Sequence, residues 1–523
     1  MRVASLAGLA LLMVVALPTR ATAGEATNTS PSEVLLISPL GVPVNVSTNA
    51  LPPGLLPPPE LGLKSQVPTP ARGGSVPVSV QQRLEESREG RDQFRWFPSY
   101  QPPLMPYLGS QDAVGNTAIK PGPLLPSSPL DVPVQQAKYR ASQVGLYYSL
   151  QQSLTWVSLT DVMQGDNTLG YYTMSFHSKW TVFDAPASGA AGWISAKFNA
   201  KTGLGAAGDT QSAALNLGSL TDPTGDWSKV NGFRIPELAW QQSLRDGELV
   251  VVAGMVNQGD YFDANSYANS GRGQFLNSAL INSMVMPLPG YAFGLNLQWQ
   301  PADEWYGMIG SSVGQGHAGL VPWSGFNWNH WSCLAEFGYA PRDFLGLGPG
   351  VYRIQPFLGQ VTGSVSTNYT VSVPGTTNTT DVTVSFPTVS PVQAGLCFNF
   401  QQQLGKDAPF GWFGRFGFGG SQVSAGAQAQ IGTGFGMRGP LKYMGLFPSR
   451  GHDAAGIGFV WSRAKDNAQS LYHENEYALE AGYVLQLTHT MKLQPDLQVV
   501  WNPAHNPDAG PATVFQLQLD IAW

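Results

Sequence analysis

The sequence predicts an all-β protein, a transmembrane antiparallel β-barrel of about 16 strands, with 18 as the alternative, preceded by a proline-rich and largely disordered arm. Three observations predict this fold. Segments of about ten residues alternate apolar and polar side chains, their polar positions carry neutral groups, chiefly Gln, and aromatic residues gather at their ends. A soluble β-sandwich also alternates, but its water-facing surface would carry more Lys and Glu.

The chain begins with a segment typical of secretory signal peptides. Arg2 supplies a positive charge, residues 3–17 are apolar, and an A-x-A-like cleavage motif ends at Ala23. We therefore expect residues 1–23 to be removed near Ala23 and the protein to be exported. No later stretch approaches 18 consecutive apolar residues, which argues against a spanning helix. In lipid, an exported all-β chain satisfies its backbone only by closing into a barrel.

Residues 24–139 are expected to form an arm or linker in the periplasm. Residues 31–134 hold 20 of the 41 prolines, and proline removes backbone donors and favours extended, solvated chain. Within this arm, residues 79–94 are either one short helix or a solvated charged stretch. Binding of peptidoglycan by the arm stays open at this point.

The composition excludes several classes of function. Only 12% of residues are charged, about half the usual ~25%, and the mean hydropathy of −0.09 shows that uncharged polar residues replace them. A net charge of −6 gives no support to nucleic-acid binding. The two cysteines, Cys333 and Cys397, fall on opposite faces of their predicted strands, which disfavours a disulfide between them.

Residues 140–523 are expected to form the barrel domain. These 384 residues accommodate about 16 strands of ~10 residues with alternating short turns and long loops, wide enough for an aqueous channel. Segments 293–300, 477–488 and 514–523 alternate clearly, so their apolar faces would meet lipid and their polar faces would enclose water. The last segment must then pair with the first strand and place Trp523 at a membrane interface.

Glutamine is frequent at the positions predicted to face the lumen. Gln both donates and accepts hydrogen bonds, as a channel for uncharged polyols requires. The alternative is that these residues only make the wall wettable. The glutamines concerned are Gln298, Gln300, Gln486, Gln494, Gln498, Gln516 and Gln518.

Four charged residues also fall opposite the apolar positions of their strands. They are Glu336, Arg353, Glu476 and Glu480. Charges on a lumen face either line a constriction that sets selectivity or form a structural salt-bridge network in the wall, and the sequence leaves both open.

Chemical motifs elsewhere carry little weight. Residues 434–439 spell G-x-G-x-x-G, but Pro440 follows where a helix should begin. Residues 310–314 spell the G-x-S-x-G of a nucleophile elbow without its strand-turn-helix context. The seven histidines show no metal-ligand spacing. We therefore expect no cofactor, no metal and no enzymatic activity.

Two blocks resemble the carbohydrate-selective porins of the OprB type. The first runs "PELAWQQSLRDGELVVVAGMVNQGDYFDANSYANSGRGQFLNSA" (236–279), and the second covers 436–503 with "ENEYALEAGYVLQL" and "LQPDLQVVWNP". The resemblance implies a 16-stranded outer-membrane channel that passes sugars by facilitated diffusion. The segment 362–390 has no counterpart in the family and is expected to be an external loop hairpin.

The resemblance adds further candidate residues. Those in the first block belong either to the same charged network or to a loop that folds inward, and the others match a "P…R…D" pattern of the family. They are Glu237, Asp263, Asn265 and Arg272 from the first block, and Arg450 and Asp453 from the pattern.

The sequence therefore predicts an outer-membrane porin for passive diffusion of monosaccharides and small oligosaccharides. Its expected partners are small neutral sugars and outer-membrane lipid, with no nucleic acid, and both a monomer and a trimer stay open. The alternatives are a structural or binding barrel tethered to the cell wall by the arm, and a general non-selective porin. An outer-membrane phospholipase would need a Ser/His pair facing lipid, which no apolar strand face provides.

Overall fold

The computed structural model describes the backbone of 33–37 and 43–47, five residues between 133 and 141, and most of 144–523. The gaps within this last range are 205–211, 226–231, 246–247, 270, 273, 290–291, 303, 315–325, 361, 373–378, 406–409, 421–425, 448–452, 466–470, 489 and 509. The predicted signal peptide and almost all of the predicted arm lie outside the described residues.

The chain divides into two units, Met1–Pro59 and Glu60–Trp523. In the first unit, β1 (Glu33–Ile37) and β2 (Pro43–Ser47) pair antiparallel. This hairpin lies in a region that the sequence predicts to be largely unstructured. The second unit contains the barrel.

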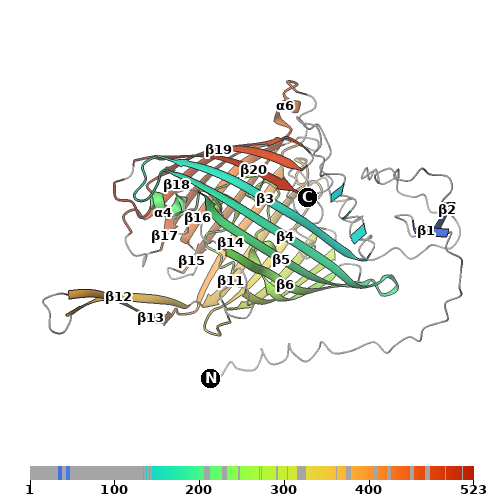
Figure 1. The fold of residues 1–523 in the computed structure, drawn as a ribbon, viewed down its shortest axis with the longest axis horizontal. Helices are drawn as coiled ribbons and strands as arrows, with labels where there is room; N and C mark the ends of the chain where they lie inside the picture. Colours follow the sequence, from blue (N-terminus) through green and yellow to red (C-terminus); the bar gives the residue numbers. More distant parts are fainter. Residues whose placement is uncertain are drawn as a thin grey trace. The chain divides into compact units, whose positions relative to one another are not determined.

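Sixteen antiparallel strands of the described residues close into a barrel (Figure 1), which confirms the predicted fold. The first half consists of β3 (Leu146–Leu159), β4 (Thr168–Ala185), β5 (Ala190–Leu204), β6 (Gly232–Leu244), β7 (Leu249–Val256), β8 (Ala292–Ala302), β9 (Trp305–Val313) and β10 (Trp331–Tyr339). The second half consists of β11 (Gly350–Gln360), β14 (Gln393–Gln403), β15 (Phe410–Gly419), β16 (Ala427–Arg438), β17 (Ala454–Ala464), β18 (Asn475–Gln486), β19 (Met491–Trp501) and β20 (Ala512–Ala522). The barrel begins six residues later than the predicted residue 140.

The last strand closes the barrel against the first, as the sequence predicts. Gln518 on β20 lies opposite Thr155 on β3, and Leu519 lies opposite Leu154. The Trp523 backbone N–H donates to the Leu150 carbonyl at 2.9 Å. No strand edge of the barrel is left open, so the ladder is continuous around the ring.

Side chains alternate across the wall as predicted. On β8, Leu295, Leu297 and Trp299 are exposed on the outer face, whereas Asn296 and Gln298 are buried on the inner face. Cys333 is half-buried and Cys397 is buried, in agreement with opposite faces of the wall, and both are free thiols. The predicted absence of a disulfide between them is confirmed.

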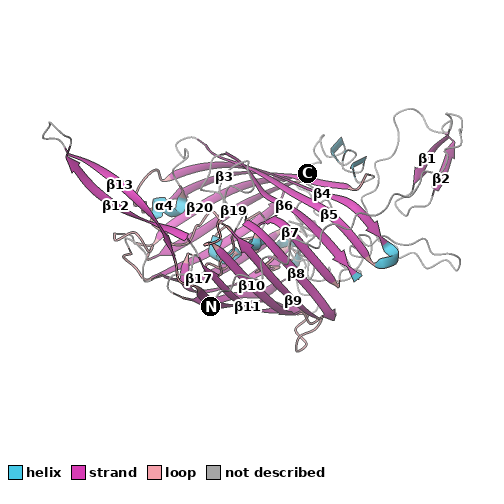
Figure 2. Cartoon of the chain, turned by 90° about the horizontal axis from the view of Figure 1, so that it is seen from below, coloured by secondary structure: helices cyan, strands magenta, loops and turns pink. Residues whose placement is uncertain are grey.

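The two ends of the barrel differ. One end has the short β4–β5, β6–β7, β8–β9 and β18–β19 turns together with the longer β16–β17 connection, whereas the other end has the long β5–β6, β7–β8 and β11–β14 connections. One of these long connections carries β12 (Thr362–Ser372) and β13 (Thr379–Val389), an antiparallel pair that confirms the predicted loop hairpin. Figures 1 and 2 show this hairpin projecting away from the barrel.

The described helices are short. They are α4 (Ala213–Leu217), α5 (Ser278–Ile281) and α6 (Pro440–Tyr443), with 3-10 turns at η5 (Pro186–Ser188) and η8 (Gln258–Asp260). None of the helices in the described part of the chain has the length and apolarity to cross a membrane. The G-x-G-x-x-G motif runs along β16, and Ser312 of the G-x-S-x-G motif lies on β9 beside Ser332, so neither motif has the turn that its chemistry needs.

The outer face provides a first prediction. We expect Leu497→Arg, on the exposed outer face near the middle of β19, to destabilise the barrel in lipid by about 2–4 kcal/mol, because the charge must enter acyl chains. Leu215→Arg on α4 is the matched control, since Leu215 is equally exposed but lies outside the strands. Denaturant titration in phospholipid vesicles measures the difference. Equal destabilisation by both substitutions would contradict a lipid-facing outer surface.

Candidate functional site

Two segments of the chain fold inside the barrel. The long inner loop (257–289) connects β7 to β8, and the short inner segment (212–225) precedes β6. Both segments form hydrogen bonds with inward-facing side chains of the surrounding strands. These inner segments and the wall opposite them form the candidate site.

Glycines on the inner face of the wall make room for the long inner loop. A Cβ atom at Gly456 would lie 2.6 Å from the Phe275 ring, and one at Gly458 would lie 2.7 Å from Leu280. A Cβ at Gly417 would similarly crowd Val285. Inward-facing glycine on β15 and β17 therefore lets side chains of the loop pack directly on the backbone of the wall.

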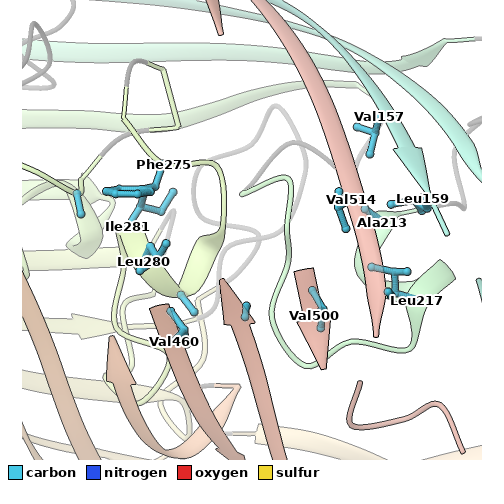
Figure 3. Packing of buried hydrophobic residues seen from close by; sticks show 14 of the residues in the cluster. Val157, Leu159, Ala213, Leu217, Phe275, Leu280, Ile281, Val460, Val500 and Val514 are labelled. Carbon is cyan, nitrogen blue, oxygen red and sulfur yellow. The ribbon is translucent and has the colours of Figure 1, made fainter. Parts of the chain in front are cut away.

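An apolar cluster fixes the inner segments against this wall. Figure 3 shows Phe275, Leu280 and Ile281 of the loop beside Val460, and Leu217 of α4 near the inner faces of β3, β19 and β20. Phe275, Leu280 and Leu217 are at most 1% exposed. Complete burial of such a side chain contributes about 1.5–3 kcal/mol, so this packing alone favours the inserted position.

Asp263 is the most connected polar residue of the loop. Its Oδ2 accepts from Arg415 Nε at 2.9 Å and from the Ser283 backbone N–H at 2.7 Å. Its Oδ1 accepts from Asn399 Nδ2 at 2.5 Å. The residue adopts a φ of 63°, which Asp tolerates better than most side chains. A single buried carboxylate thus joins the loop to β14 and β15.

Glu336 and Arg353 extend the Asp263 cluster along the wall. Tyr306 Oη donates to Glu336 at 2.6 Å, and the Arg353 Nε lies 3.5 Å from the same carboxylate. The Asp263 backbone N–H donates to the other Glu336 oxygen at 3.2 Å. The two predicted wall charges are therefore paired with each other and attached to the loop.

Asn265 continues this attachment toward β14. Its Nδ2 donates to Asn399 Oδ1 at 2.8 Å and to the Phe400 carbonyl at 2.9 Å. The next residue, Ser266, donates its backbone N–H to Gln401 at 2.7 Å. Four consecutive residues of the loop are thus hydrogen-bonded to strands β10 to β15.

Glu480 holds the following part of the loop. Its two oxygens accept from the backbone N–H groups of Leu276 and Asn277, at 2.5 and 2.9 Å. Gln494 donates to the Gln274 carbonyl at 2.7 Å, and Gln498 accepts from Asn277 at 3.1 Å. Three predicted lumen residues on β18 and β19 therefore bind loop backbone and loop side chains.

Glu476 does the same for the short inner segment. Its carboxylate accepts from the Leu220 and Thr221 backbone N–H groups at 2.6 and 2.9 Å, and from the Ser219 hydroxyl at 2.8 Å. The Ala504 backbone N–H supplies a further bond at 3.0 Å. Charge-assisted bonds of this kind are about twice as strong as neutral ones, so the segment is firmly held.

The two inner segments also bind each other. The Ser278 backbone N–H donates to the Asp222 carbonyl at 2.8 Å, and the Ser278 hydroxyl accepts from the Asp222 N–H at 2.9 Å. Gln498 and Gln516 both donate to the Pro223 carbonyl, at 2.8 and 2.7 Å. The segments therefore form one unit inside the barrel, which is bound to β14–β20 and also contacts β5 and β10.

Arg272 links this unit to β3 and β4, the strands that follow β20 around the barrel. Its guanidinium donates to Gln151 at 2.5 Å and Ser153 at 3.0 Å on β3, and it lies 4.0 Å from Asp520 on β20. A further bond reaches Ser175 on β4 at 3.2 Å. One side chain of the loop thus crosses part of the lumen.

The charges that retain contact with solvent lie near β5 and Arg272. Lys197 and Asp260 are paired at 3.4 Å with side chains 15% and 19% exposed, and the Arg272 side chain is 14% exposed. Beside Asp260, burial and the neighbouring carboxylates raise the pKa of the Tyr261 phenol well above its usual value, so it stays neutral. Lys197, Asp260 and Arg272 therefore keep partial contact with solvent.

The predicted site residues therefore divide into groups. Glu336, Arg353, Glu476, Glu480, Asp263, Asn265, Gln494 and Gln498 are at most 2% exposed and attach the inner segments. Arg272 attaches the loop while staying partly accessible. Buried Glu237 and Gln298 face inward on β6 and β8. Their contact with a transported solute stays a prediction.

Asp453 lies apart from the inner segments. It accepts from Tyr483 Oη at 2.8 Å and from the Gln486 backbone N–H at 3.0 Å, at the base of the β16–β17 connection. Arg450, predicted with it, lies outside the described residues.

Several residues central to the site are missing from the sequence predictions. Arg415, Asn399 and Gln401 bind the loop, and Tyr306 joins Glu336 to Arg353. Arg415 alternates with Phe416 and Phe418 on β15, so the pattern places it inward. That alternation is the signal that would have identified it.

The Glu480 anchor leads to a second prediction. Glu480→Ala leaves the Leu276 and Asn277 amides without acceptors, at about 1–3 kcal/mol for each orphaned group. We expect faster hydrogen exchange across the loop around these residues, with the sixteen-stranded ladder still protected. Glu474→Ala is the control, because Glu474 is exposed and pairs at 3.8 Å with Arg463 outside the lumen. Unchanged loop exchange in the Glu480 variant would disprove the anchoring role.

Comparison with known proteins agrees with this architecture. The high-pH structure of Pseudomonas putida OprB matches with a TM-score of 0.56 and 16% identity, over 74% of this chain and 96% of that chain. The low-pH structure of the same protein has a TM-score of 0.44 and 15% identity, over 74% and 95%. A mutant of the Rh. blastica porin has a TM-score of 0.41 and 9% identity, over 72% and 100%.

No curated protein sequence matches the chain. A family model described as "Carbohydrate-selective porin, OprB family" matches residues 180–523, from within β4 to the end of the barrel. This match covers well over half of the chain. It includes the residues that hold the long inner loop and the partly exposed Lys197, Asp260 and Arg272. The chain therefore belongs to the OprB family of carbohydrate-selective porins.

Proposed function

We propose that the protein is a porin through which neutral sugars, both monosaccharides and small oligosaccharides, diffuse passively across the bacterial outer membrane. The observation that supports this most is a loop held rigidly inside a closed barrel, which narrows the lumen without dividing the ring of strands. A wall of fixed shape limits the size of the solute, and its polar groups replace the water that the solute sheds.

The wall opposite the inner segments suits uncharged polyols. Ser153, Thr155, Thr173 and Ser175 of β3 and β4 face inward, are at most 5% exposed, and bond to Arg272 or to β20, so a sugar would have to replace these partners. A hydroxyl both donates and accepts hydrogen bonds, so it can exchange partners with a sugar hydroxyl at little net change in energy. Transport needs only the concentration gradient, with no covalent step and no cofactor.

The accessible charges have a separate role in the proposal. Arg272 and Lys197 lie near Asp260 and Asp520, so positive and negative groups face one another in a confined space. A field between them orients water and raises the barrier for an ion, whereas a neutral dipolar solute can realign. The arrangement thus favours sugars over salts.

Liposome swelling tests the proposed function. We expect vesicles containing the protein to swell in monosaccharides and more slowly in larger oligosaccharides, and sugar to reduce ion conductance in planar bilayers. Equal permeability to all solutes below a size limit would favour a general porin. No conductance and no swelling would favour a structural barrel tethered to the cell wall, and lipid hydrolysis would favour the phospholipase.

The remaining features of the proposal concern the cell. The signal peptide is cleaved near Ala23, the barrel is surrounded by outer-membrane lipid, and the arm formed by residues 24–139 contacts peptidoglycan. Mass spectrometry of the mature N-terminus and sedimentation with purified peptidoglycan measure the first and last of these. Cross-linking in the membrane distinguishes a monomer from a trimer.

Arg272 provides a third prediction. We expect Arg272→Ala to widen the lumen, because it removes the guanidinium that reaches from the loop to β3, β4 and β20. Swelling in oligosaccharides should rise relative to swelling in monosaccharides, and single-channel conductance should increase. Arg245→Ala, in the exposed β6–β7 turn, serves as the control and should change neither quantity. A lower oligosaccharide rate in the Arg272 variant would contradict the proposed constriction.

The Lys197–Asp260 pair provides a fourth prediction. Asp260→Asn removes the negative partner 3.4 Å from Lys197, so the accessible lumen becomes more positive. We expect the zero-current potential in a salt gradient to shift toward anion selectivity, with a larger shift at low ionic strength because salt screens the charge. Glu248→Gln, in the turn outside the lumen, is the control with the same change in net charge. Equal shifts of the zero-current potential in both variants would show that Asp260 affects ion selectivity no more than a charge outside the lumen does.

A further inference from the structure

An exposed apolar surface lies outside the channel, on the turn between β16 and β17. Tyr443, Met444, Leu446 and Phe447 are 63%, 59%, 61% and 56% exposed, respectively. These values exceed those of most lipid-facing side chains on the strands, such as Leu297 at 40%. Figure 1 shows α6, at the start of this turn, standing clear of the barrel wall. Four adjacent apolar side chains without cover are unusual on a surface that meets only water.

The backbone of this turn is ordered by its own hydrogen bonds. The Tyr443 and Met444 N–H groups donate to the carbonyls of Gly439 and Pro440, at 2.9 and 3.0 Å. The Leu446 and Phe447 N–H groups both donate to the Leu441 carbonyl, at 3.0 and 3.1 Å. A segment with its backbone satisfied can enter an apolar medium at low cost, because no bare N–H group accompanies the side chains.

A second turn at the same end of the barrel has the same character. In the β10–β11 turn, Leu345 is 82% exposed and Leu347 is also exposed. Phe344 of this turn packs on Tyr352, with ring centroids 4.7 Å apart. Strands β10, β11, β14, β15, β16 and β17 follow one another in the barrel, so the two turns occupy one sector of its rim.

A row of aromatic side chains runs beneath both turns on the outer face. Phe400 is 4.7 Å from Trp412 and stacks on Tyr352 at 6.4 Å, while Trp305 stacks on Tyr339 at 4.4 Å. Phe435 lies opposite Trp412 on the next strand. Aromatic rows at strand ends mark the headgroup level of a membrane barrel. Through Phe344, the β10–β11 turn is continuous with this row.

We propose that the turns 341–347 and 439–447 form a lipid anchor that inserts into the headgroup region of the leaflet at the short-turn end of the barrel. The occupant is phospholipid, because the apolar turn residues extend the surface that already faces acyl chains. Exposed Lys442, in α6 and directly before the four apolar residues, adds attraction to anionic headgroups. The anchor fixes the depth and tilt of the barrel on one side.

Spin labelling tests the anchor. We propose to attach a nitroxide to Leu446→Cys, and separately to Met444→Cys, in a Cys333→Ala, Cys397→Ala background. Ser188→Cys is the matched control, since Ser188 is exposed in the β4–β5 turn at the same end. The labelled full-length protein is reconstituted in vesicles of phosphatidylethanolamine and phosphatidylglycerol. Collision rates are measured with molecular oxygen, which concentrates in lipid, and with a water-soluble nickel chelate.

We expect the ratio of oxygen to nickel accessibility at 444 and 446 to exceed that at 188 several-fold. A ratio equal to that at 188 would overturn the proposal. Cover by protein would also overturn it: the N-terminal arm would lower both collision rates, and a second copy would broaden the spectrum until unlabelled protein is added. Sugar-dependent swelling of the labelled channels is recorded in parallel, and it verifies that each variant folds without depending on the anchor.

Discussion

Closure of the barrel is the constraint on which the rest of the structure depends. A strand in lipid has no water to bond with, so every N–H and C=O group must find a neighbouring strand. The β20–β3 pairing meets this need for the last and first strands, and the ladder has no end. A ring of sixteen strands is wider than its own side chains can fill, so the interior must hold water or more chain. In this protein two segments of the chain fold into the interior.

One recurring interaction holds the inner segments inside the barrel. A buried carboxylate, on the wall or on the loop, accepts hydrogen bonds from backbone N–H groups. Glu480 binds Leu276 and Asn277, Glu476 binds Leu220 and Thr221, and Asp263 binds Ser283. Such bonds hold backbone, so they fix the path of a loop and not only a side chain. Removing water from a carboxylate is unfavourable, and several donors for each group are needed to compensate. The glycines of β17 let the loop approach closely enough to supply them.

Local pattern predicted the wall but not the interior. Alternation along 293–300 correctly placed Leu297 outside and Gln298 inside, because the direction of a side chain on a strand depends only on its neighbours. Whether an inward group meets water or chain depends on a loop elsewhere: the bond from Leu276 to Glu480 joins residues 204 positions apart. Glu336, Arg353, Glu476 and Glu480 point away from the outer face as the alternation predicts, but alternation could not identify their partners.

The two sides of the lumen therefore serve different purposes. The strands from β14 to β20 carry carboxylate and amide side chains that form hydrogen bonds with the inner segments. These polar groups therefore hold the inner segments in place. The side from β3 to β5 carries the partly exposed Lys197 and inward-facing hydroxyl groups that bond to Arg272. Arg272 belongs to both, since its backbone is in the loop and its guanidinium reaches β3. A change that loosens the loop must also move Arg272, so the aperture and its charge are coupled through one residue.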